Sequence, residues 1–170
     1  ELIFNDVIVP KENLLGKEGD GFKIAMSTLD GGRIGIAAQA LGIAQGAYDA
    51  AVAYSKERIQ FGKPVLKNQA LQFKVADMAI KTEAARVLVN NCMRQMDAGE
   101  MVRKDGAIVK TFVTDAMQEV VSNAVQVLGG YGYSEEYPVE KLMRDAKIFQ
   151  IFEGTNEVQR IVVANNVIGK

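Results

Sequence analysis

One glutamate, Glu153, stands at a chain reversal where it could act as a general base. It lies in the run Ile151-Phe152-Glu153-Gly154-Thr155, between two segments with helical periodicity. Gly154 lets the backbone pass close to a ligand, and the apolar residues before Glu153 would limit the access of water to its carboxyl group, which favours a base that works near neutral pH. Thr155 could cap the following helix, whose amides would then attract an anion or a polar cofactor group. Taken alone, an exposed glutamate in an ordinary helix–helix loop is the simpler interpretation.

Three further segments offer polar groups or bare backbone. The run Gln126–Tyr133 is a glycine-rich turn after a helix, but it lacks the preceding strand and following helix of a dinucleotide fingerprint. On its own it is a helix end followed by a loop. Arg58, in the run Arg58–Pro64, could bind an anion or simply complement a helix C-terminus. The run Asp30–Arg33 could be a solvent-exposed kink.

The residue counts narrow the chemistry. The 170 residues contain no histidine and one cysteine, Cys92. This excludes Ser-His-Asp and Cys-His catalysis, any His-containing metal site and an internal disulfide within the chain. We therefore expect no metal, and any reaction must use carboxylates, Lys or Tyr side chains, or a cofactor.

Charge and hydropathy exclude two classes of partner. The formal net charge is −1 and no basic stripe is present, which argues against nucleic acid. No apolar stretch reaches the roughly 18 residues of a membrane span, and the acidic start does not resemble a signal peptide.

The periodicity predicts an all-α, up-and-down four-helix bundle with short C-terminal helices. Apolar residues recur at steps of three and four in five segments, with two glycines near the start of the first that could interrupt it. The expected helices are 21 to about 59, 71–96, 109–127, 139–148 and 157–167. Residues 2–9, β-branched and closed by Pro10, predict a strand without a partner in this chain. We expect residues 1–16 to be the end of a missing middle β domain with its linker, and 17–170 to be the helical bundle domain.

Taken jointly, three motifs resemble those of the acyl-CoA dehydrogenase family, and most of all its short-chain (butyryl-type) branch. The resemblance covers nearly the whole chain. One match is Arg58 with Phe61-Gly62-Lys63, and another is Ile151 to Thr155. The most specific match keeps every spacing of the family's C-terminal motif: Gln126, Gly129, Gly130, Gly132, Tyr133, Glu136, Lys141 and Asp145.

The resemblance implies a role for each matching residue. Glu153 stands at the position of the catalytic base. Residues at positions that contact acyl-CoA are Asp30, Gly31, Gly32, Arg33 and Gly154. Residues at positions that hold the cofactor, FAD, are Arg58, Gln69, Gln126, Val127, Leu128, Gly129, Gly130, Thr155, Asn156 and Glu157.

The implied activity is flavin-dependent α,β-dehydrogenation of an acyl-CoA thioester to a trans-2-enoyl-CoA, with electrons passed to an electron-transferring flavoprotein. The implied assembly is a homodimer or homotetramer, in which Arg58 of one subunit and Gln126–Gly130 from its partner's side meet at one dinucleotide. The implied location is the cytoplasm of a bacterium or the mitochondrial matrix of a eukaryote.

Two departures from the family pattern bear on the site. Phe152 stands where many relatives have Tyr, which affects the polarity of the substrate pocket, and Gly32 stands where one branch carries its base. We expect the isolated segment to be folded, inactive and a weak flavin binder. The alternatives are a non-catalytic helical assembly module and an acyl-CoA oxidase-like flavoprotein.

Overall fold

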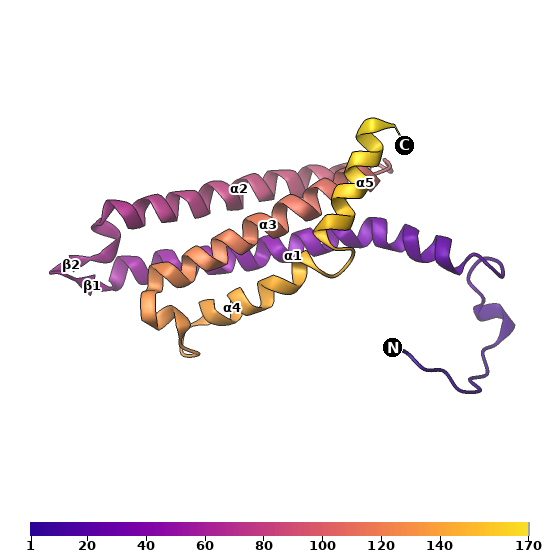
Figure 1. The fold of residues 1–170 in the computed structure, drawn as a ribbon, viewed down its shortest axis with the longest axis horizontal. Helices are drawn as coiled ribbons and strands as arrows, with labels where there is room; N and C mark the ends of the chain where they lie inside the picture. The colour runs from indigo at the N-terminus through magenta and orange to yellow at the C-terminus, as the bar shows by residue number, and fades with distance from the viewer. Residues whose placement is uncertain (170) are drawn as a thin grey trace.

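Three long helices run side by side and make up most of the chain (Figure 1). The computed structural model describes residues 1–169. The long helices are α1 (Gly21–Glu57), α2 (Gln69–Asp97) and α3 (Arg103–Leu128). Helix α4 (Pro138–Ala146) returns along the bundle, and α5 (Asn156–Ile168) crosses it at an angle. The prediction of an all-α, up-and-down bundle with short C-terminal helices is confirmed.

Small residues allow α1 and α3 to approach closely. Five alanines of α1 at steps of three and four are almost fully buried: Ala37, Ala40, Ala44, Ala47 and Ala51. Valines of α3 fill the facing side, with Val113, Val120 and Val121 each at most 1% exposed. Gly31 and Gly32 do not interrupt α1, which stays helical throughout. Packing of the alanine face therefore outweighs the weak helix propensity of the two glycines.

The second helix buries the stripe that its periodicity predicts. The buried residues of α2 are Met78, Thr82, Ala85, Val89 and Cys92. They follow alternating steps of four and three, as expected of a helix that rests on one side of a bundle. Among the described residues, no helix is both long and apolar enough to cross a membrane.

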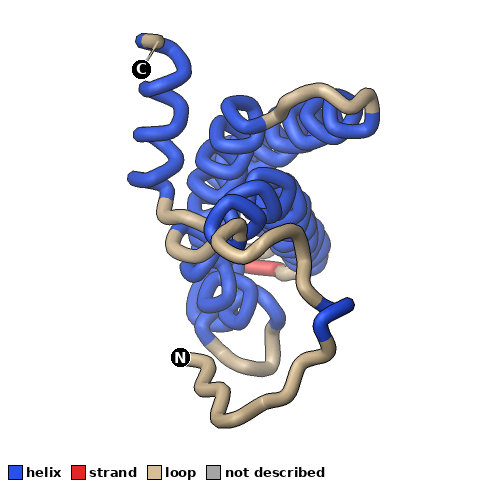
Figure 2. Tube along the Cα trace, turned by 90° about the vertical axis from the view of Figure 1, so that its right-hand side faces the viewer, coloured by secondary structure: helices blue, strands red, loops and turns tan. Residues whose placement is uncertain are grey.

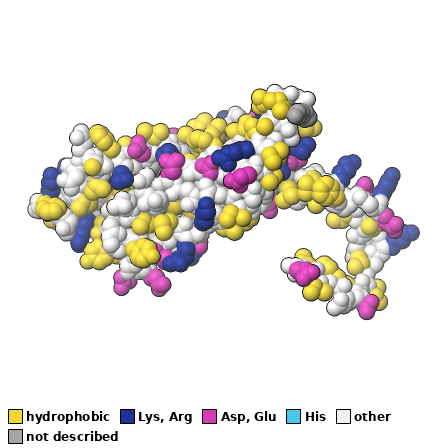
Figure 3. Space-filling model, viewed as in Figure 1, with side chains coloured by type: hydrophobic (Ala, Val, Ile, Leu, Met, Phe, Trp, Pro, Cys, Tyr) yellow, Lys and Arg dark blue, Asp and Glu magenta, His cyan; other side chains and the backbone are white. Residues whose placement is uncertain are grey.

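The N-terminal segment differs from the prediction. Residues 2–9 form no strand, and the segment leaves the bundle as an exposed arm (Figures 1, 2 and 3). Its apolar side chains lie in solvent, with Phe4 75% and Ile8 95% exposed. A strand needs a neighbouring strand to satisfy its backbone groups, and this chain supplies none to residues 2–9. The domain boundary proposed at residue 16 stays a prediction.

A tight hairpin joins α1 to α2. Strands β1 (Ile59–Gln60) and β2 (Lys63–Pro64) pair antiparallel around Phe61 and Gly62, which have φ of 52° and 77°. Short 3-10 helices complete the connections: η1 (Lys11–Asn13), η2 (Val65–Lys67), η3 (Gly129–Tyr133) and η4 (Lys147–Gln150). Because α2 returns the chain, the C-terminal ends of α1 and α3 lie at the same end of the bundle (Figure 1).

Candidate functional site

The turn between η4 and α5 presents Glu153 to helix α1. Glu153 and Gly154 both have left-handed backbone conformations, with φ of 56° and 87°. A Cβ added to Gly32 would lie 2.8 Å from Glu153 Oε2, so the carboxylate rests directly on the bare backbone of α1. The structure thus brings together two residues that are far apart in sequence.

The remaining predicted substrate residues lie on the same part of α1. Arg33 is 7% exposed, and its Nη1 donates to Asp30 Oδ1 over 2.6 Å. These residues are therefore part of a continuous, partly buried helix and not an exposed kink. Within the described residues, the buried Arg33 Nε has no hydrogen-bond partner. An unpaired donor of this kind favours an additional polar group beside it.

Two residues that the sequence analysis missed hold the turn in place. Lys110 of α3 is fully buried, and its Nζ donates to the Gly154 carbonyl over 2.9 Å and to Asn156 Oδ1 over 2.8 Å. Burial lowers the pKa of Lys110 from 10.5 to about 8, and the nearby Asp115 and Glu157 carboxylates only partly oppose this. Gln159 of α5, also fully buried, donates from Nε2 to the carbonyls of Glu153 and Gly154, each over 3.1 Å.

A signal for Lys110 was present in the sequence. It precedes Thr114, Met117 and Val121 at helical steps and so shares a buried stripe of α3 with them. A lysine on a buried stripe is unusual, because lysine is almost never fully buried unless it has a partner. Its partner, a carbonyl at residue 154, cannot be deduced from helical periodicity.

The run Thr155–Glu157 begins α5. Thr155 caps the helix by accepting a hydrogen bond from the Val158 amide over 3.3 Å. Asn156 is buried, and its Nδ2 donates to Thr114 Oγ1 over 2.9 Å and to Asp115 Oδ1 over 2.8 Å. The side-chain groups of Asn156 thus form hydrogen bonds within the protein and do not face outwards. Glu157 is exposed, and hydrogen bonds from its own backbone amide and then from Thr155 lower the pKa of its carboxyl group.

The other predicted cofactor residues lie at the opposite end of the bundle. Arg58 and the segment Val127–Gly130 line one groove of about 580 Å³. Arg58 lies over the Tyr131 ring, with 4.9 Å from its guanidinium carbon to the ring centre. Added Cβ atoms at Gly129 and Gly130 would meet nothing within 4 Å, so their backbone is open to a ligand. Gln69 and Gln126 are exposed near this end but are not among the residues that line the groove.

This arrangement corrects one expectation. Arg58 and the glycine turn meet within a single chain and not across a subunit interface, because α1 and α3 end side by side. Gly32 and Glu57 are 25 residues apart in α1, which at about 1.5 Å per residue is roughly 38 Å. Glu153 and the groove therefore lie at opposite ends, and the predicted cofactor residues divide into two separate groups.

The groove fits a phosphate-bearing cofactor. In the described part of the chain Arg58 forms no ion pair, which leaves its planar set of donors for an anion. The open backbone of the glycine turn and the Tyr131 ring lie beside it. The fold and the site together define a helical domain that presents the Glu153 carboxylate at one end and a groove with an unpaired arginine at the other, among the residues that the structure describes.

The comparisons with known proteins identify the family. The family model described as acyl-CoA dehydrogenase, C-terminal domain, matches residues 19–168. The short-chain specific acyl-CoA dehydrogenase of Megasphaera elsdenii is 58% identical over 168 residues, which are 99% of this chain and 44% of that protein. This chain belongs to the acyl-CoA dehydrogenase family.

Solved structures agree with this assignment. Butyryl-CoA dehydrogenase from Megasphaera elsdenii superimposes with a TM-score of 0.95 at 57% identity, over 98% of this chain and 43% of that one. A chain of the structure described as the electron transferring flavoprotein of Acidaminococcus fermentans gives a TM-score of 0.96 at 59% identity, over 99% of this chain and 44% of that one. The chain spans less than half the length of the relatives it matches.

Proposed function

We propose that this chain supplies the catalytic base of a flavin-dependent dehydrogenase that converts short-chain acyl-CoA to trans-2-enoyl-CoA. The observation that carries the proposal is the placement of Glu153, whose carboxylate is held on a left-handed turn against the bare backbone of Gly32. Family membership and the 58% identity to a short-chain specific relative support the same reaction.

The residues of the turn match the demands of this chemistry. Glu153 takes the α-proton of the thioester, and bound FAD supplies the acceptor for the β-hydrogen, which leaves as hydride while the C=C bond forms. The thioester oxygen needs hydrogen-bond donors as negative charge develops on it. Among the described residues, the amides of Glu153 and Gly154 donate no hydrogen bond to the protein, so they are free for this purpose.

The distance between the two ends favours an assembly of at least two copies. Glu153, which rests on Gly32, and the Arg58 groove of the same chain lie roughly 38 Å apart along α1. A second copy that brings its groove to the first copy's Glu153 end would complete the site. We therefore propose a homodimer or homotetramer with FAD held between copies, and an electron-transferring flavoprotein as the partner that reoxidises the flavin.

The test is the Glu153→Gln variant of the flavin-loaded enzyme. It should retain its flavin but lose anaerobic flavin bleaching by butyryl-CoA, because the amide cannot accept the α-proton. Glu83→Gln is the matched control, since Glu83 is an exposed α2 carboxylate paired with Arg86. A Glu153→Gln enzyme that keeps more than a few per cent of the bleaching rate contradicts the assignment. An unaltered enzyme that does not bleach indicates the assembly-module alternative, and rapid reoxidation by oxygen indicates an oxidase.

A further inference from the structure

We propose that Lys110 and Gln159 are positioning residues that clamp the carbonyl groups of the Glu153–Gly154 turn and thereby aim the Glu153 carboxylate at its substrate. We call these two side chains the turn clamp. The inference deepens the proposed function, since it rests on Glu153 being the base.

The first support is the environment of Lys110. It is fully buried, yet in the described structure no carboxylate oxygen lies within salt-bridge distance of its Nζ. Its hydrogen bonds go to the Gly154 carbonyl and to Asn156 Oδ1. Burying a charge without a charged partner is unfavourable for folding. The buried charge of Lys110 is therefore better explained by its hydrogen bond to the turn than by a contribution to the stability of the fold.

The second support is the backbone that the clamp holds. Glu153, a residue with a side chain, has a φ of 56°, a conformation that normally favours glycine. Strained conformations of this kind persist only where surrounding contacts fix them, and they are typical of functional sites. The carbonyl of the strained Glu153 and that of Gly154 are both fixed: Gln159 Nε2 donates a hydrogen bond to each of them, and Lys110 Nζ donates to the second.

The third support is the closeness of the packing around the turn. A Cβ added to Gly154 would lie 2.4 Å from Gln159 Nε2, so Gln159 presses against the turn and leaves no room for a side chain. Gln159 Oε1 is buried without a hydrogen-bond partner among the described residues. The side-chain NH2 group of Gln159 therefore donates to the two carbonyls of the turn, while its side-chain oxygen accepts no hydrogen bond from the described residues.

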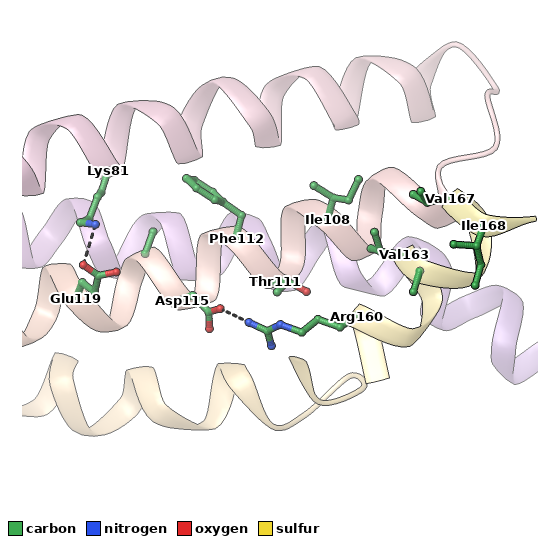
Figure 4. A pocket seen from close by; sticks show the side chains of 12 residues that line it. Lys81, Ile108, Thr111, Phe112, Asp115, Glu119, Arg160, Val163, Val167 and Ile168 are labelled. Atoms are coloured by element: carbon green, nitrogen blue, oxygen red, sulfur yellow. Dashed lines mark hydrogen bonds and ion pairs between the residues drawn. The ribbon is translucent and has the colours of Figure 1, made fainter. Parts of the chain in front are cut away.

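A network of hydrogen bonds around Asp115 supports the turn clamp. Asp115 of α3 accepts hydrogen bonds from Gln150 over 2.7 Å, from Asn156 over 2.8 Å and from Arg160 over 2.9 Å. Figure 4 shows the Asp115–Arg160 pair between α3 and α5, beside an apolar hollow of about 720 Å³. Asp115 thus ties both flanks of the turn to α3, the helix that also carries Lys110 five residues earlier.

Different helices contact the side chain of Glu153 and the backbone of its turn. The Glu153 side chain points to Gly32 of α1, while the Glu153 carbonyl is held by Gln159 of α5 and the Gly154 carbonyl by both Gln159 and Lys110 of α3. Without the clamp the turn can relax from its left-handed conformation, and the carboxylate then loses its fixed position. Misplacement of a catalytic group by about 1 Å costs on the order of 100-fold in rate.

The experiment compares Lys110→Met and Gln159→Met with the unaltered flavin-loaded enzyme. Methionine keeps similar bulk and flexibility but removes the donors. Each variant should lower kcat for butyryl-CoA oxidation by about 10- to 100-fold with little change in KM and flavin retention. Lys74→Met is the matched control, because it removes a lysine hydrogen bond, to Asn123 over 3.1 Å, far along the bundle.

A second readout does not depend on activity. The amides of Ile151 and Phe152 donate to the Ile148 carbonyl over 2.9 Å and 3.0 Å, directly before the turn. The hydrogen–deuterium exchange of these two amides should become about tenfold faster in both clamp variants, because the loss of one hydrogen bond lowers the free energy of local opening. Their exchange should remain unchanged in Lys74→Met. If one clamp variant does not fold, the other still gives both readouts.

The outcomes separate this inference from the proposed function. Clamp variants with the parent's kcat and exchange rates overturn the inference, whatever Glu153 does. Slower turnover without faster exchange at Ile151 and Phe152 also overturns it, since the turn has then not loosened. If the unaltered enzyme does not oxidise butyryl-CoA, the proposed function is wrong, and unchanged exchange in the clamp variants would then reject the clamp itself.

Discussion

Replacement of Gly32 by alanine should separate the stability of the bundle from the activity of Glu153. The added Cβ would stand 2.8 Å from Glu153 Oε2, while ordinary contacts begin at about 3.4 Å. The carboxylate oxygen must therefore retreat by at least about 0.6 Å, the difference between those two distances. Because this oxygen is the far end of a flexible side chain, it can move without displacing the backbone.

The expected magnitudes differ for stability and for rate. Alanine in place of glycine inside a helix stabilises the folded state by about 1 kcal/mol. A Glu153 side chain pushed off its preferred rotamer destabilises it by roughly 0.5–1.5 kcal/mol. The free energy of unfolding should therefore change by no more than about 1 kcal/mol in either direction. A displacement of this size at a general base should lower kcat by roughly 10- to 100-fold.

The assay is stopped-flow reduction of the enzyme-bound flavin by butyryl-CoA, with urea unfolding measured on the same preparations. Gly42→Ala is the matched control, since Gly42 is also in α1 and an added Cβ there would meet nothing within 4 Å. The control should gain up to about 1 kcal/mol in stability and keep its rate. A Gly32→Ala enzyme that reduces its flavin within threefold of Gly42→Ala would refute the placement of the carboxylate against α1.

Three further predictions concern other parts of the site. Arg58→Ala should weaken flavin binding by on the order of 1.5 to 3 kcal/mol, or one to two decades; unchanged affinity with a lower melting temperature of the apoprotein would show that Arg58 only neutralises a helix end. Burial lowers the pKa of Lys110 from 10.5 to about 8. The charged amine therefore destabilises the folded state fully below pH 8, and this destabilisation decreases as the pH rises towards 10.5. The stability of the parent relative to Lys110→Met should then rise by about 2 kcal/mol between pH 7 and 9.5, measured by urea unfolding, and an equal difference at both pH values would contradict the lowered pKa. Thr155→Ala should destabilise α5 by about 1 kcal/mol through the lost cap, seen in thermal unfolding, and no change would mean that the Thr155–Val158 hydrogen bond is unimportant.

The sequence by itself was sufficient for the helices and for the family. Local periodicity sets which residues of α2 and α3 face inward, since apolar side chains at steps of three and four must be buried together. The same information predicted a strand over residues 2–9 that the structure does not contain, because strand pairing requires a partner that this chain does not provide to them. It also overstated the effect of Gly31 and Gly32, which the packing of α1 overrides.

Only the tertiary structure decided how the site is put together. It placed Glu153 against Gly32 and joined Arg58 to the glycine turn within one chain, since both relations depend on which helix ends lie side by side. It also revealed Lys110 as the support of the turn, a contact between residues 44 apart in sequence. A local motif is sufficient to propose Glu153 as the base, but the position of its carboxylate depends on contacts with residues of three helices, α1, α3 and α5. Motifs record short-range spacing, whereas the direction of a side chain is set by packing between segments distant in the chain.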